Sequence, residues 1–101
     1  MILVRNVFRL KFGQAREAIT VWKEGLAIAE RANVGRGRYR LLTDLVGPEF
    51  YTLVFEGTYA SLADFEQSAQ ALMAVPEWRA WYPRVTALSE GGHREILNIV
   101  D

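Results

Sequence analysis

The sequence predicts an α+β fold in which helices cover one face of an antiparallel sheet. Two patterns carry this prediction. In residues 1–12, and again near the middle of the chain, apolar and polar side chains alternate, as they do in strands. Between these stretches apolar residues recur at steps of three and four, as on one face of a helix. The order of the two patterns along the chain sets the expected topology.

The chain opens with a predicted strand, MILVRNVFRLKF, at residues 1–12. Its even positions are apolar apart from Asn6, whereas its odd positions include charged residues. A helix is predicted over residues 14–32, where one apolar stripe contains Trp22. The sequence NVGRG at residues 33–37 ends this helix, because Asn and Gly tolerate a positive φ.

Two further strands are predicted at residues 38–47 and 49–59. They are joined at Gly47-Pro48, which indicates a hairpin. Ser61 is a good N-cap for a second helix over residues 62–73, because its hydroxyl can accept a hydrogen bond from a free backbone N–H of the first turn.

The last predicted strand runs from His93 to Val100, after a turn at Gly91-Gly92. The predicted order is therefore βαββαβ. This is the ferredoxin-like arrangement, a four-stranded antiparallel sheet with both helices on one face. We expect residues 1–101 to form a single domain of this kind.

The predicted central strands are apolar on both faces, although the two helices cover only one. In the third strand Tyr51 and Phe55 lie on one side, and Phe50 and Val54 lie on the other. Antiparallel sheets that are open to water on one face usually alternate cleanly. We therefore expect a second copy of the chain to cover the open face in a twofold homodimer, with Phe55 or Tyr51 facing the partner.

The composition argues against several classes of function. The chain has 12 basic and 12 acidic residues, so its net charge gives no reason to bind nucleic acid or an anionic membrane. It has no cysteine and one histidine, which excludes thiolate and multi-histidine metal sites. No apolar run approaches the length of a membrane helix, and the N-terminal residues lack a signal-peptide pattern. We expect a cytoplasmic protein with no metal and no cofactor.

The segment PEWRAWYPRV, residues 76–85, contains two of the three tryptophans. Trp78, Trp81 and Tyr82 share one face of a helical segment. Pro83 predicts a break, with a short helix before it and a second turn after it. Packing explains Trp78. Trp81 and Tyr82 fit either packing or the wall of a pocket beside the broken helix, because one end of each ring is polar.

With these elements, the sequence resembles the dimeric α/β-barrel superfamily. It is most similar to the NIPSNAP-like members and, beyond them, to the antibiotic-biosynthesis monooxygenases. The resemblance rests on the opening strand RNVFRLKFG, the stretch FYTLVFEGTYASLADFEQSAQALMAVPEWRAWYPRVTAL and a short closing strand. It implies a homodimer whose two sheets form a barrel, with a pocket between helices and sheet in each subunit.

Haem-degrading members of the superfamily offer a comparison of single positions. They have an Asn on the first strand, a Trp on the second helix and an iron-ligating His shortly after it. These positions fall on Asn6, Ser68 and Tyr82, so only the Asn is kept. Tyrosinate can ligate ferric haem, but a Tyr with an ordinary pKa of ~10 needs a nearby cation to ionise. We expect no haem turnover by that mechanism.

Three polar features could contribute to a site. Asn6 must find hydrogen-bond partners, either in the structure, such as a helix end or water, or in a ligand or oxygen intermediate. His93 is either exposed or structurally bonded, or it is the default general base. Arg36, Arg38 and Arg40 either bind anions or protect a sheet edge and meet acids across the dimer.

These observations lead to a functional hypothesis. We expect a NIPSNAP-like homodimer that binds a small hydrophobic or aromatic ligand in a pocket formed by Asn6, Trp22, Trp81 and Tyr82. The alternative is a cofactor-independent monooxygenase of the antibiotic-biosynthesis type, with Asn6 and His93 as catalytic candidates. Such chemistry needs polar groups that position a substrate in a dry pocket more than it needs a motif. A purely structural assembly module is a third possibility.

Overall fold

The computed structural model of the protein describes residues 1–34 and 37–101, with the element order βαββααβ. The seven elements are β1 (Ile2–Leu10), α1 (Ala15–Ala32), β2 (Arg38–Thr43), β3 (Thr52–Tyr59), α2 (Leu62–Met73), α3 (Pro76–Thr86) and β4 (Ser89–Asn98).

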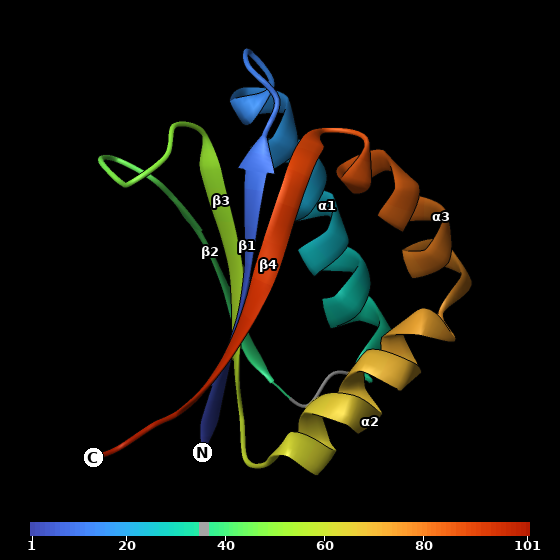
Figure 1. Cartoon of the computed structure of the whole chain (residues 1–101). Coiled ribbons are helices and arrows are strands. Elements are labelled where there is room, and N and C mark those ends of the chain that lie inside the picture. The colour runs from blue at the N-terminus through green and yellow to red at the C-terminus, as the bar shows by residue number, and fades with distance from the viewer. Residues whose placement is uncertain (35–36) are drawn as a thin grey trace.

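The four strands form one antiparallel sheet in the order β2-β3-β1-β4. The helices lie together against one face of this sheet (Figure 1). This arrangement confirms the expected ferredoxin-like α+β fold, with a third helix added between α2 and the last strand. The N-cap hydrogen bond predicted for α2 is present, since the Ser61 hydroxyl accepts from the Asp64 backbone N–H at 3.2 Å. Asn33 ends α1 at φ 53°, as expected.

The segment predicted to break at Pro83 is one continuous helix, α3, so that prediction was wrong. Pro83 cannot donate to the Arg79 carbonyl, but the backbone bonds on either side are intact. The Arg79 N–H donates to the Val75 carbonyl at 3.1 Å, and the Ala87 N–H donates to the Pro83 carbonyl at 3.2 Å. Arg79 and Pro83 both lie on the exposed side of the helix, where water can solvate the unbonded carbonyl.

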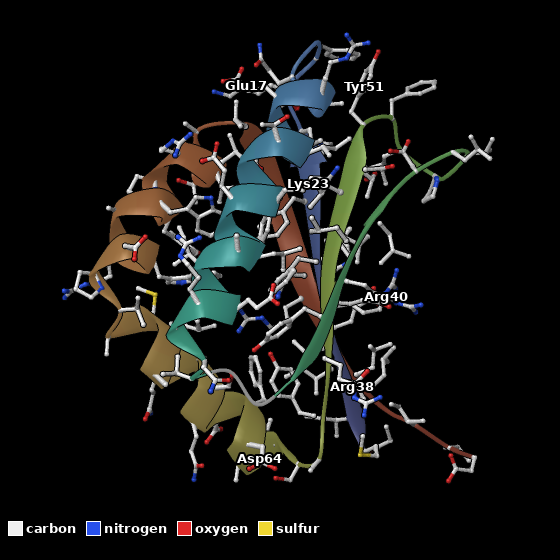
Figure 2. All side chains as sticks on the ribbon, turned by 180° about the vertical axis from the view of Figure 1, so that it is seen from behind. Glu17, Lys23, Arg38, Arg40, Tyr51 and Asp64 are labelled. Atoms are coloured by element: carbon white, nitrogen blue, oxygen red, sulfur yellow. The ribbon has the colours of Figure 1, made fainter. Side chains whose placement is uncertain are left out.

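The loop between β2 and β3 is longer than predicted. The strand β2 ends early, at Thr43, and β3 begins late, at Thr52, so residues 44–51 form the connection. Tyr51 lies in this connection at a φ of 61°, and its carbonyl accepts a hydrogen bond from the Leu10 N–H at 2.7 Å. Figure 2 places Tyr51 at the end of the sheet. The residue is therefore on neither face of a strand.

The Gly91-Gly92 pair is inside β4 rather than in a turn before it. Gly92 pairs with Phe8 across the β1–β4 ladder. An ideal Cβ on Gly92 would lie 2.5 Å from the Val7 carbonyl oxygen. The glycine thus permits a close approach of two strands, which is a role that the sequence alone does not separate from a turn.

Phe55 faces the helices, so the expectation that Phe55 or Tyr51 faces a partner subunit was wrong. The β1–β3 register pairs Phe55 with Asn6, on the face that the helices cover. The opposite face, called the open face below, carries the alternate residues Leu3, Arg5, Val7, Arg38, Arg40, Leu42, Val54, Glu56, His93, Glu95 and Leu97.

The core is centred on a contact between α1 and α3. Trp81 is 2% exposed, and its Nε1–H donates to the Val21 carbonyl at 2.7 Å. Its six-membered ring lies over Gly25, where an ideal Cβ would come within 2.2 Å of the indole. A glycine at this position therefore allows the two helices to approach with a tryptophan between them.

This contact predicts that Gly25→Ala destabilises the protein. We expect the free energy of unfolding to fall by about 1–3 kcal/mol, because the added methyl overpacks the core. The loss should occur although Ala is the better helix former by ~1 kcal/mol. Chemical denaturation measures it. Gly47→Ala is the control, because a Cβ there makes only ordinary contacts of 3.7 Å or more. Equal stabilities of the two variants would contradict the prediction.

Candidate functional site

A cavity of ≈ 690 Å³, called the helix-side cavity below, lies between the covered face of the sheet and helices α2 and α3. In Figure 1 the ribbon of β4 faces α2 and α3 across this region. Most of the lining is apolar, and its aromatic members are Phe8, Trp22, Phe55, Tyr59, Phe65, Trp78 and Tyr82. The size and apolar character are those of small-molecule pockets, which typically measure ≈ 300–1,000 Å³.

Asn6 lines this cavity, and its hydrogen-bond partner is a side chain on the neighbouring strand. The Asn6 Oδ1 accepts from the Arg94 Nε at 2.6 Å. The two residues are paired directly across the β1–β4 ladder. The partner is neither of the two structural ones considered from the sequence, a helix end or water. A guanidinium has no acceptor, so the bond fixes the amide with its oxygen toward Arg94.

Trp22 also lines the cavity and joins it to the core. Its ring lies 5.4 Å from Phe8, 4.9 Å from Phe55 and 5.1 Å from Trp81, between ring centroids. Trp22 is 3% exposed, and its Nε1 is buried without an acceptor among the described residues.

The aromatic segment divides between core and cavity. Trp78 and Tyr82 line the cavity, Trp78 being almost buried and Tyr82 43% exposed at the rim. Trp81 is in the core instead of the wall, because its ring packs over α1 and its N–H is bonded there. The pocket-lining interpretation of Trp81 therefore does not hold, and packing explains it.

Tyr59 and Ser68 form a polar corner beside the cavity. The Ser68 hydroxyl lies 3.1 Å from the Tyr39 hydroxyl, and Ser68 is 1% exposed. Burial, reinforced by the Tyr39 side chain, raises the pKa of the Tyr59 phenol well above its ordinary value. Tyr59 therefore stays neutral at physiological pH and keeps its proton as a hydrogen-bond donor. The hydroxyls of Ser68, Tyr39 and Tyr59 make this corner polar.

His93 extends from the open face, on the opposite side of the sheet from Asn6. Its Nε2 lies 3.1 Å from the Glu95 carboxylate, which also accepts from Arg5 at 2.8 Å. The hydrogen bond with His93 holds the pKa of Glu95 below its usual range. His93 also borders the helix-side cavity, but its side chain bonds Glu95 on the open face, so the side chains of the two catalytic candidates lie on opposite faces of the sheet.

Within the arginine stripe, Arg40 pairs with an acid of its own chain. Arg38 and Arg40 lie on the side of the sheet away from the helices, as Figure 2 shows. The Arg40 Nε bonds Glu56, which also pairs with Arg5 at 3.4 Å and is only 4% exposed. Arg36 lies outside the described residues.

Arg94 and Phe65 are two lining residues of the helix-side cavity that were not among the site residues expected from the sequence. In the sequence, Arg94 stands between His93 and Glu95, so nothing marks it as facing the helices. The signal that finds it is the strand register, because pairing with Asn6 on β1 fixes the face on which Arg94 lies.

Two classes of site find no support in residues 1–34 and 37–101. Within those ranges no group of three or more His, Cys, Asp or Glu side chains comes together where it could hold a metal ion. No helix in the same ranges is both long and apolar enough to cross a membrane.

Solved structures share this fold over nearly the whole chain. A NIPSNAP-family protein from Agrobacterium tumefaciens is 26% identical with a TM-score of 0.85, over 99% of this chain and 86% of its own. An uncharacterised NIPSNAP-domain protein from Burkholderia xenovorans is 22% identical with a TM-score of 0.85, over 99% and 95% of the two chains. The chain has the fold of NIPSNAP-domain proteins.

The expected NIPSNAP-like resemblance is thus confirmed. The more distant resemblance is also present, since SnoaB from Streptomyces nogalater, described as a cofactor-independent oxygenase, is 19% identical. Its TM-score is 0.71, over 99% of this chain and 93% of its own. At that identity the likeness shows the fold alone. No protein-family model matches the sequence, and no curated protein matches it.

Proposed function

We propose that this NIPSNAP-like chain binds a small hydrophobic or aromatic ligand in the helix-side cavity. The observation that carries the proposal is the cavity itself, ≈ 690 Å³ in volume and lined mainly by aromatic side chains. Within this lining Asn6 and Arg94 form one polar pair that could fix the orientation of a bound molecule.

Filling the cavity tests this proposal. Ala69 of α2 lines the cavity and is exposed to solvent. We expect Ala69→Trp to weaken binding of the neutral fluorescent probe N-phenyl-1-naphthylamine about tenfold or more, because the indole takes the place of the ligand. A fluorescence titration measures this affinity. Ala63→Trp is the matched control, an exposed alanine of the same helix outside the lining. Probe binding that is absent from the wild type, or equal in both variants, would contradict the proposal.

The second candidate is cofactor-independent oxygenation in the same cavity. It is favoured by the fold shared with SnoaB and by an aromatic cavity in which the Asn6–Arg94 pair stands among the polar lining residues. In such a reaction an activated ring CH₂ is oxidised to C=O; one atom of O₂ enters the product and the other leaves as water. The substrate itself supplies the electrons. Oxygen uptake measured with an anthrone as substrate separates this reaction from binding alone. We expect uptake by the wild-type protein and its loss in Ala69→Trp, because the filled cavity cannot take the substrate.

We also propose that the open face is covered by a second copy of the chain. Leu42 is 36% exposed and Leu97 46% exposed on this face, beside the half-buried Leu3 and Val7. The neighbouring connection adds Leu45, Val46 and Phe50, which are at least 80% exposed. Exposed apolar side chains grouped in this way are typical of an interface rather than of a free monomer.

The charges of the open face are compatible with being covered. Glu56 pairs with Arg5 and Arg40, and Glu95 pairs with Arg5 and His93. Because each carboxylate already has a cationic partner in its own chain, burial would leave no carboxylate of this network unpaired. We propose that this dimer is cytoplasmic, as expected from the sequence.

An acidic residue on the open face should dissociate the dimer. We expect wild-type protein to sediment as a dimer at low micromolar concentration and Leu42→Asp to sediment as a monomer, because a carboxylate would be buried without a partner. Leu62→Asp is the control, since Leu62 is 50% exposed on α2, away from the open face. A monomeric wild type, or a Leu42→Asp variant that remains dimeric, would rule out this interface.

A further inference from the structure

Arg94 is held in the wall of the helix-side cavity from two sides. From β1, the Asn6 Oδ1 accepts a hydrogen bond from its Nε at 2.6 Å. From α2, the Phe65 ring lies under its guanidinium, with 5.3 Å between the guanidinium carbon and the ring centroid. A guanidinium that lies over an aromatic ring and is bonded through Nε is held from two sides, while its two terminal NH₂ groups keep their donors.

The charge of Arg94 is not compensated by a carboxylate. Every acidic residue of the chain lies in the described ranges, and none of them forms an ion pair with Arg94. Glu90 lines the same cavity, but its carboxylate pairs with Arg9 at 3.4 Å. Tyr59, the nearby phenol, stays neutral for the reason given above. The cavity therefore presents a permanent positive charge beside an aromatic wall.

The surroundings of Arg94 include a second polar group for an anion. Asn6 contributes a second group, because its oxygen is turned toward Arg94 and its Nδ2 hydrogens have no acceptor among the described contacts. A carboxylate is planar, with two oxygens that accept from parallel N–H groups, and it suits the terminal edge of a guanidinium.

We propose that the ligand of the helix-side cavity is an aromatic or otherwise apolar carboxylic acid, whose carboxylate is held by the terminal NH₂ groups of Arg94. Its apolar body lies against Trp22, Phe55 and Trp78. Asn6 acts as a positioning residue, because it fixes the plane of the guanidinium. The inference rests on the proposed function, since it names the chemical class of the ligand that the cavity takes.

Two probes of nearly equal shape test the charge requirement. Both are measured by their displacement of N-phenyl-1-naphthylamine from the wild-type protein. We expect 2-naphthoate to bind with about tenfold higher affinity than 2-naphthamide, because only the acid forms charge-assisted hydrogen bonds. This preference should shrink at high salt, since the guanidinium is partly exposed to solvent.

Removing the guanidinium should abolish the preference without closing the cavity. In Arg94→Gln we expect naphthoate affinity to fall about tenfold while naphthamide affinity stays within about twofold. Arg79→Gln is the matched control, because it removes the same charge from an exposed position of α3 outside the lining. Arg94→Lys keeps the positive charge but loses the planar guanidinium, so it should recover only part of the preference for naphthoate. If Arg94→Gln does not fold, Arg94→Lys is used in its place.

The outcomes separate the two proposals. Equal binding of both naphthalenes by the wild type, with the neutral probe still bound, overturns the carboxylate inference and leaves the cavity's function standing. If Arg94→Gln loses affinity for naphthoate and for naphthamide equally, Arg94 has a structural role, and the carboxylate inference is overturned as well. Binding of neither naphthalene nor the neutral probe by the wild type refutes the proposed function itself.

Discussion

The contact of Trp81 with Gly25 and Val21 is the constraint on which the rest of the molecule depends. The indole fills the space above the glycine and donates its N–H to the α1 backbone, so α3 has one position on α1. Trp22, one helical turn from Gly25, then packs edge-on against Trp81. The buried contact between α1 and α3 therefore fixes the position of the Trp22 wall of the helix-side cavity. Sites are rigid when packing holds their supporting residues in this way.

The two faces of the sheet differ in character, although the same strands form both. On the covered face the aromatic residues stack, with Phe55 lying between Trp22 and Tyr39. On the open face a nearly buried Glu56 is neutralised by two arginines. A buried carboxylate without a partner is costly, so this acid requires its arginines in any assembly state. Alternation along β3 lets one strand serve an aromatic cavity and a paired, charged surface at once.

Much of the fold could be predicted from the sequence, because its local signals agree with the final structure. The N-cap at Ser61, the stop at Asn33 and the alternation of β1 each depend on neighbouring residues. The errors arose where tertiary context decides. Pro83 is tolerated in α3 because the Arg79 carbonyl, which it leaves without a hydrogen bond, is on the exposed side of the helix. Trp81 belongs to the core because Gly25 lies beneath its ring. The pairing of Asn6 with a side chain 88 positions away follows only from the register of two strands.

The cavity itself follows from the sizes of the side chains around it. Its lining combines large rings, such as Trp22 and Phe65, with very small residues, Gly92 on β4 and Ala69 on α2. Rigid rings cannot bend to fill the volume that small residues leave, whereas flexible aliphatic chains can do so more readily. Gly92 cannot be enlarged without a clash, since a Cβ there would lie 2.5 Å from the Val7 carbonyl oxygen, but Ala69 leaves space that a larger side chain could occupy. The space beside Ala69 and the Arg94 guanidinium is better explained by a molecule that occupies it.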